Sequence, residues 1–173
     1  GPSLRLRSSA LVNHDLLLDL GPDIMAVSQR HRIDLTGVRY CLQTHPHADH
    51  MDLSHLLSRS PAFGVVGAPR LHLHASPATL ARAHQTFKRD LSGHGLFDPG
   101  VEDELNLALH PVGPLEPFQA GPYRVTAYPA NHAPGLGAYL YAIQDEGRSM
   151  FYGIDTASLS EHTWEALGQR ETP

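Results

Sequence analysis

The sequence is poor in cysteine and lysine, and each shortage excludes a class of protein. Its 173 residues include one cysteine, Cys41, which excludes an intramolecular disulfide framework and any zinc site built from cysteines alone. The net charge of −5, with one lysine among 13 basic residues, argues against the broad basic surface of a nonspecific nucleic-acid binder. The charge therefore does not indicate a nucleic-acid partner, although a local basic patch is compatible with it.

Long apolar runs are missing as well. No stretch reaches the roughly 20 apolar residues that span a bilayer, and the start lacks the basic-then-apolar pattern of a signal peptide. Together with the single cysteine, these absences predict a soluble, cytoplasmic protein without a membrane partner.

Length and composition predict one domain. A chain of 173 residues with 41% hydrophobic content is long enough for one cored domain and too short for two. The opening Gly1-Pro2-Ser3 is typical of the scar that a protease leaves when a tag is removed. We therefore expect residues 1–2 to be a remnant and residues 3–173 to form the domain.

Hydrophobic patterns and turn residues predict strands in runs, with helices between some of them, which is typical of an α+β sandwich. The β-favouring runs are 5–12, 15–19, 38–43, 70–74, 105–112, 123–128, 138–143 and 149–154. The helical segments are 24–31, 51–59, 76–91 and 158–169. Asn13-His14 predicts a hairpin turn between the first two strands, and residues 92–104, rich in Gly, Asp and Glu, predict a loop.

The segment THPHADHMD, residues 44–52, concentrates metal-binding side chains directly after an apolar strand. His45 and His47 are two residues apart in an extended loop, so their imidazoles point the same way and can hold one ion. Asp49 and His50 follow where the chain turns into a helix, and they can serve a neighbouring ion. Imidazole with carboxylate suits zinc, manganese or iron better than calcium, because borderline metals favour nitrogen donors.

These four residues form the HxHxDH signature of the metallo-β-lactamase superfamily, which the chain resembles over nearly its whole length. The run SSALV…LLLDLGPD resembles the opening hairpin of the family with its Asp-x-Gly turn. In YPANHA, His132 stands where the family carries a third histidine for the first metal. In MFYGIDTA, Asp155 stands where the family carries the carboxylate that bridges both metals.

The resemblance implies a four-layer αββα sandwich and a centre that holds two divalent ions, zinc or manganese. The metal ligands it implies are His45, His47, Asp49, His50, His132 and Asp155. A hydroxide held between the two ions would attack the substrate, and Asp49, as the catalytic residue, would orient this hydroxide and accept its proton.

Within the superfamily, the run NHA…GAYLYAI…SMFYGIDTA resembles most closely the phosphodiesterase branch. This branch includes the cyclic phosphodiesterase that accompanies carbon-phosphorus lyase and, more distantly, the tRNA-processing RNase Z. The resemblance thus implies a phosphodiesterase that acts on a small anionic ester, and it offers a homodimer as a candidate assembly. A thioester or lactone hydrolase of the same fold would use the same ligands.

The sequence departs from the family pattern at both ends. Family members usually begin with a further strand upstream of Ser3, and they carry one more histidine for the second metal beyond the helix that follows Asp155. The chain therefore resembles a core fragment, or one that has lost terminal segments. This departure keeps two other functions open: a mononuclear iron oxygenase that uses His45, His47 and His132, and a noncatalytic metal-binding protein.

The other histidines are predicted to lie outside the metal centre. His72 and His74 form a second HxH pair without an acidic partner, which indicates a solvated or packed strand face. His55 lies on the helix behind the site, where exposure is favoured over a supporting contact. His162 is in a helix that is wrongly placed to replace the missing histidine.

Overall fold

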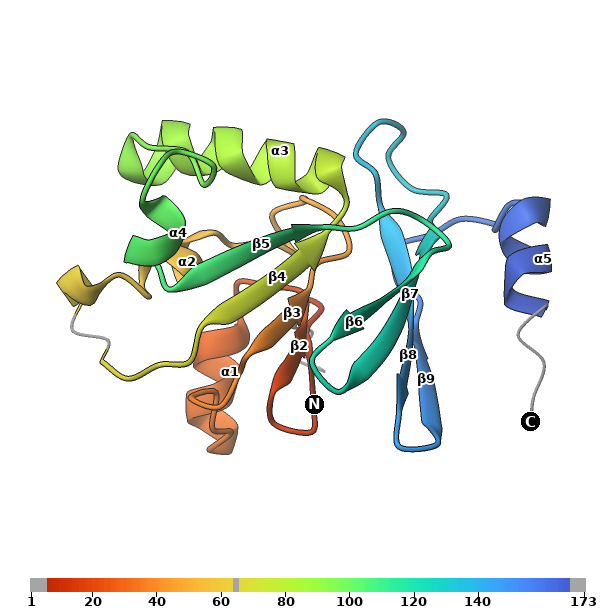
Figure 1. The fold of residues 1–173 in the computed structure, drawn as a ribbon, viewed down its shortest axis with the longest axis horizontal. Helices are drawn as coiled ribbons and strands as arrows, with labels where there is room; N and C mark the ends of the chain where they lie inside the picture. Colours follow the sequence, from red (N-terminus) through yellow and green to blue (C-terminus); the bar gives the residue numbers. More distant parts are fainter. Residues whose placement is uncertain (1–5, 64–65, 169–173) are drawn as a thin grey trace, which may run out of the picture.

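The computed structural model describes residues 6–63 and 66–168, which form two β-sheets with helices packed against one of them (Figure 1). The α+β class predicted from the sequence is confirmed. Residues 1–2, which we interpret as a tag remnant, lie outside the described residues. Arg5 and Gln169, where two of the predicted elements begin and end, lie outside them as well.

The first sheet is mostly parallel. Its strands, in spatial order, are β1 (Ala10–Val12), β2 (Leu16–Leu18), β3 (Tyr40–Leu42), β4 (Leu71–Ala75) and β5 (Leu107–Pro111). β1 pairs antiparallel with β2 through the predicted hairpin, whose Asn13 and His14 both adopt positive φ angles of 47° and 70°. The three following pairings are parallel, so β2, β3, β4 and β5 end at the same edge of the sheet.

The second sheet is an antiparallel meander. It contains β6 (Pro117–Ala120), β7 (Tyr123–Pro129), β8 (Tyr139–Asp145) and β9 (Arg148–Tyr152) in that order. Its inner face packs on the first sheet through a core that includes Leu16, Leu42, Tyr123 and Tyr141. Since β8 is antiparallel to both of its neighbours, β7 and β9 run in the same direction and also end at one common edge.

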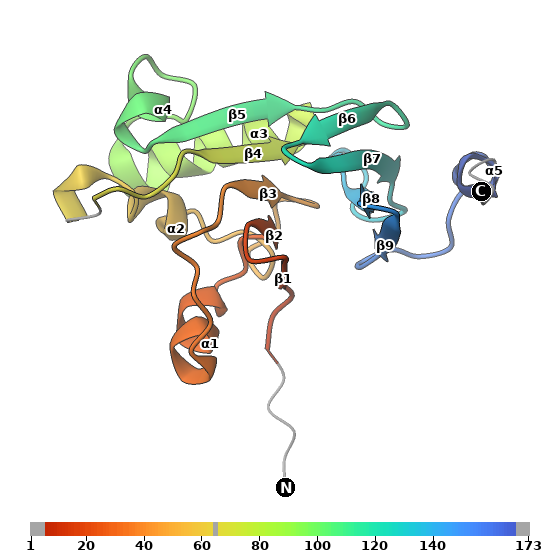
Figure 2. The same cartoon turned by 60° about the horizontal axis from the view of Figure 1, so that its bottom comes forward.

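Helices cover the other face of the first sheet. They are α1 (Ile24–His31), α2 (Ser54–Leu57), a 3-10 turn at Pro61–Phe63, α3 (Pro77–Phe87), a π-helical turn at Lys88–Ser92 and α4 (Val101–Glu104). Figures 1 and 2 show α3 lying along β4 and β5, where Leu80, Ala83 and Phe87 join the core with Leu73. Within residues 6–63 and 66–168, no helix has both the length and the apolar character required to cross a membrane.

For the predicted fourth layer, next to the second sheet, the described residues contain one helix, α5 (Glu161–Gly168), and strand β9 is largely exposed. In both views this helix lies beyond β9, apart from the helices that cover the first sheet (Figures 1 and 2). It begins at Glu161, later than the predicted start at residue 158, because the Ser160 hydroxyl caps it by accepting the amide N–H of Thr163 at 3.1 Å.

Several predicted elements differ from the structure in extent. Strand β6 was not predicted, because its opening proline indicates a turn, whereas proline is tolerated at the first residue of an edge strand. The predicted loop 92–104 contains the short helix α4. The last predicted strand, 149–154, ends instead at Tyr152, and this leaves Asp155 free to adopt a left-handed backbone with φ 46°.

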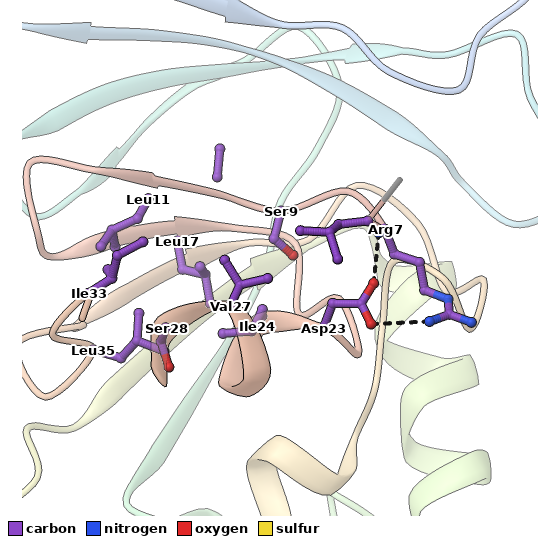
Figure 3. A pocket seen from close by; sticks show the side chains of 12 residues that line it. Arg7, Ser9, Leu11, Leu17, Asp23, Ile24, Val27, Ser28, Ile33 and Leu35 are labelled. Atoms are coloured by element: carbon purple, nitrogen blue, oxygen red, sulfur yellow. Dashed lines mark hydrogen bonds and ion pairs between the residues drawn. The ribbon is translucent and has the colours of Figure 1, made fainter. Parts of the chain in front are cut away.

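An apolar cavity of about 150 Å³ lies between α1 and the β1–β2 hairpin (Figure 3). Leu11, Leu17 and Val27 contribute to its wall, and Arg7 and Asp23, which form an ion pair of 3.1 Å, line one end of it (Figure 3). None of the predicted metal ligands lines this cavity, so it is separate from the histidine-rich loop.

The buried imidazole of His74 makes folding sensitive to acid. Its side chain on β4 is 5% exposed and stacks on Phe118 of β6, with 5.2 Å between ring centroids. Burial, followed by the neighbouring His110 and His72, lowers the pKa of His74 from 6.5 to about 3. Below pH 6.5 the imidazole of His74 is therefore protonated in the unfolded chain but stays neutral in the folded chain. The free energy of unfolding consequently falls as the pH drops from 6.5 towards 3.

We expect His74→Phe, which keeps the ring stack, to lessen this loss. Between pH 7 and pH 5 its free energy of unfolding should decrease by roughly 2 kcal/mol less than that of the wild type. Urea unfolding at both pH values in the presence of EDTA measures the difference. His94→Phe, a change at an exposed histidine, serves as the control, and equal pH dependence in wild type and His74→Phe would contradict the assignment.

Candidate metal centre

The histidine-rich loop leaves the end of β3 and is held in shape by Gln43. This side chain is fully buried, and its Nε2 donates to the carbonyl oxygens of His45 and His50 at 3.0 and 3.1 Å. Its Oε1 accepts the amide N–H of Leu20 at 3.1 Å. One amide side chain thus satisfies backbone groups near both ends of the loop, and this fixes the path of the backbone that carries the histidines.

The second sheet delivers the two remaining predicted ligands to this loop. His132 follows β7 and Asp155 follows β9, the two strands that end at a common edge. Asn131 joins their loops, because its amide N–H donates to Thr156 Oγ1 at 3.0 Å and its Nδ2 donates to the Ser158 carbonyl at 2.9 Å. This cross-link sets the two segments side by side.

Two hydrogen bonds from β8 join the second sheet to the histidine-rich loop. Tyr139 donates its amide N–H to the Thr44 carbonyl at 2.9 Å, and the Tyr141 hydroxyl donates to the Gln43 carbonyl at 2.8 Å. Segments that are more than 80 residues apart in the chain, such as those of His47 and His132, therefore meet at one place.

The first donor group consists of His45, His47 and His132. One ring nitrogen from each lies within 4.8 Å of the others, and His132 Nε2 is 3.1 Å from His47 Nδ1. The centroid of the His45 ring is 4.7 Å from that of each of the other two rings. Three imidazoles facing a common point suit zinc and other borderline divalent ions.

The second donor group consists of His45, His50 and Asp155. Asp155 Oδ2 lies 3.1 Å from His50 Nε2 and 3.8 Å from His45 Nε2. Asp155 Oδ2 is also 3.9 Å from His132 Nε2, so this carboxylate borders both donor groups. The sixth predicted ligand, Asp49, belongs to neither group: its side chain is 57% exposed at the rim, with Oδ2 3.6 Å from His50 Nε2.

His45 is the member that the two groups share, and its ring is prepared to bind an ion. The Thr44 hydroxyl donates to Asp19 at 2.9 Å, so its oxygen accepts the Nδ1–H of His45 at 3.0 Å and leaves Nε2 with a lone pair. Nε2 is buried without a hydrogen-bond partner, which costs about 1–3 kcal/mol unless a ligand satisfies it.

The charge state of His45 agrees with this geometry. Burial and then the neighbouring His50 and His47 lower the pKa of His45 to about 4, which keeps the imidazole neutral at physiological pH. A neutral ring with an orphaned, inward-facing nitrogen, shared by two groups that also contain a carboxylate, fits a pair of divalent ions of the zinc or manganese type.

Asp19 is the residue whose role was missed in the sequence, where it was read only as part of a turn. Its carboxylate is fully buried and accepts the Nδ1–H of His50 at 2.9 Å and the amide N–H of Thr44 at 2.7 Å. Although burial lowers the pKa of His50, the hydrogen bond and charge of Asp19 raise it above its ordinary value. Asp19 thereby holds the proton on Nδ1 and turns Nε2 of His50 towards Asp155.

The remaining histidines lie outside both groups. His55 is half-buried rather than exposed, and its Nε2 lies 3.1 Å from the Gly21 carbonyl oxygen, so it supports the turn after β2. His162 is on α5, a helix that lies beyond β9 (Figure 1), and it belongs to neither donor group.

Comparison with known proteins identifies the family. A family model described as a beta-lactamase superfamily domain matches residues 14–172. The chain belongs to the metallo-β-lactamase superfamily. No curated protein matches the chain at a significant level.

Solved structures share the metallo-β-lactamase fold. A diphosphatase of the PhnP family has a TM-score of 0.66 at 23% identity, over 94% of this chain and 57% of its own. The metallo-β-lactamase fold protein YhfI from Bacillus subtilis has a TM-score of 0.60 at 18% identity, over 87% and 56%. Zn²⁺-bound PqqB from Methylobacterium extorquens has a TM-score of 0.59 at 20% identity, over 90% and 54%. This member of the superfamily thus spans a little over half the length of each of these proteins.

The role of Asp19 can be tested by removing its charge. In Asp19→Asn, an amide N–H faces His50 Nδ1, which forces the imidazole proton onto Nε2, the atom that faces Asp155. We expect zinc to bind the second donor group about 10–100-fold more weakly, as is found when supporting partners of metal ligands are removed. Titration of zinc against a chromophoric chelator measures this, with Asp23→Asn on the same turn as the control. Unchanged affinity for every ion in Asp19→Asn would overturn the role.

Proposed function

We propose that the protein is a metal-dependent phosphodiesterase that acts on a small anionic ester. One observation carries the proposal: two donor groups, one of three imidazoles and one with a carboxylate, meet at the orphaned Nε2 of His45. A pair of divalent ions, when bound there, would lower the pKa of a water towards neutrality and neutralise the charge that develops on the ester.

Each residue of the centre has a separate task in this proposal. When ions are bound, His45, His47 and His132 would hold one of them, and His50 and Asp155 would hold the other. Asp49 stands at the exposed rim, with its Oδ2 3.6 Å from His50 Nε2, so its carboxylate would orient the attacking water and accept its proton.

The geometry favours two ions over one. A mononuclear centre would use the first donor group and leave His50 uncommitted. Instead, Asp19 aims His50 at Asp155, 3.1 Å away, which prepares a second position. The Zn²⁺-bound PqqB supports zinc as a candidate for this fold.

The phosphodiester is proposed for chemical reasons. Paired cations suit an ester that carries a negative charge in its ground state and gains more in the transition state. The resemblance of the PhnP-family diphosphatase agrees with a phosphorus-centred reaction, although at 23% identity it shows the fold alone. Cytoplasmic location and homodimer formation stay predictions of the sequence.

Hydrolysis of bis-p-nitrophenyl phosphate by the zinc- or manganese-loaded protein tests the activity. We expect turnover that EDTA abolishes and that falls about 10²–10⁴-fold in Asp49→Asn, because the proton acceptor is lost. Asp52→Asn makes the same chemical change on the same loop, outside both donor groups, and should retain turnover. Absence of turnover with this ester, together with hydrolysis of a thioester or lactone, would assign the centre to another substrate class.

Metal removal should also lower thermal stability, because an ion that binds only the folded state adds to its stability. At a free zinc concentration of about 100 times the dissociation constant, the gain is about 2.7 kcal/mol, which raises the melting temperature by about 5–10 °C. Differential scanning calorimetry with and without EDTA measures the shift. The double variant His47→Asn/His132→Asn should lose part of this shift in melting temperature. An identical melting temperature of the wild type with and without EDTA would contradict firm metal binding.

A further inference from the structure

Burial does not hold the segment that carries Asp155. Within residues 153–158, Ile154 is half-buried and the other five residues are exposed. Strand β9, which leads into this segment, is largely exposed as well. The loop after β3 differs, because its ligands His45 and His50 are 1% and 2% exposed. Contacts other than packing must therefore keep the Asp155 carboxylate 3.1 Å from His50 Nε2.

The backbone of Asp155 is in a conformation that needs such contacts. Its φ angle of 46° lies in the left-handed region, which residues other than glycine adopt infrequently, although aspartate tolerates it better than most. A residue keeps this conformation only when the surrounding structure determines it. A return to the extended region would redirect the Cα–Cβ bond and carry the carboxylate away from His50.

Hydrogen bonds between Asn131 and the residues after Asp155 supply these contacts. The amide N–H of Asn131 donates to Thr156 Oγ1 at 3.0 Å, and its carbonyl oxygen accepts the amide N–H of Ala157 at 3.0 Å. The Thr156 hydroxyl donates in turn to the Ala157 carbonyl at 3.0 Å. The Thr156 side chain thus receives one hydrogen bond from the neighbouring loop and makes another to its own, directly after the left-handed residue.

We propose that Thr156 is a positioning residue for the second metal ion. Its hydroxyl fixes the backbone that follows Asp155, and thereby holds Asp155 Oδ2 towards the His50 ring, where the second donor group forms. Supporting groups of this kind orient the ligands of metal ions without touching the ion. The role rests on the two-ion centre of the proposed function.

The first donor group depends less on this hydroxyl. Two of its histidines belong to the loop after β3, which Gln43 holds. The third, His132, lies in a loop whose base is closed by a separate hydrogen bond, from the Ala130 amide N–H to the Ala138 carbonyl at 2.9 Å. Removal of the Thr156 hydroxyl should therefore weaken the second ion and spare the first.

Zinc titration of the ¹⁵N-labelled full chain, followed through the imidazole nitrogen signals by NMR, separates the two ions. His47 reports the first ion, and His50 reports the second. Thr156→Val removes the hydroxyl and keeps the size and branching of the side chain. We expect the zinc concentration at the midpoint of the His50 step to rise about tenfold, as is found when supporting partners of metal ligands are lost. The His47 step should keep its wild-type midpoint.

Two variants on the same segment serve as controls. Thr156→Ser keeps the hydroxyl and should restore the wild-type His50 step. Ser158→Ala removes a nearby hydroxyl but retains the Ser158 carbonyl that accepts Asn131 Nδ2, so both steps should stay at the wild-type midpoints. An unchanged His50 step in Thr156→Val, an equal weakening of both steps, or no recovery in Thr156→Ser would overturn the positioning role.

A further variant covers the case in which Thr156→Val fails to fold. Asn131→Ala removes the hydrogen bond from Asn131 Nδ2 to the Ser158 carbonyl and should also weaken the His50 step more than the His47 step; equal steps would count against the role. Because the readout is binding, two zinc steps in a wild type without phosphodiester turnover would reject the phosphodiesterase and keep the role of Thr156. A wild type without a His50 step would reject the two-ion centre and the role together.

Discussion

The buried carboxylate of Asp19 is the constraint on which the centre depends. It has no exposure to solvent, and it accepts hydrogen bonds from Gln43 Nε2, from the amide and hydroxyl of Thr44, and from the His50 ring. A buried charge is tolerated only when such partners compensate for its lost hydration, which would otherwise cost several kcal/mol. The loop after β3 therefore has little freedom: a different loop path would leave the carboxylate uncompensated.

This constraint reaches the ligands through short, direct links. Thr44 connects Asp19 to the Nδ1 side of His45, and the Asp19 contact with His50 Nδ1 does the same for the second donor group. In both rings the inner nitrogen is tied to the protein network, so the outer nitrogen is presented to the ions with a defined orientation. One carboxylate thus organises ligands of both groups without contacting an ion.

The donor groups also connect the two sheets. The loop after β3 belongs to the first sheet, whereas His132 and Asp155 follow strands of the second, and hydrogen bonds from Tyr139 and Tyr141 hold the sheets in register at this edge. Ions bound here would cross-link the halves of the sandwich, which links metal binding to folding stability.

The sequence by itself determined the α+β class, the positions of most strands, and the identity of the donor-rich loop, because periodicity, turn chemistry and residue type are local properties. It also nominated His132 and Asp155 through resemblance to the superfamily. Only the tertiary structure decided that His45 is shared by both groups, that Asp49 stands at the rim, and that Asp19 is more than a turn residue. It likewise brought His110 beside His74. These features depend on strand register and on which buried polar groups form hydrogen bonds with one another. Such pairings join segments that are distant in the chain, so they leave no local pattern in the sequence.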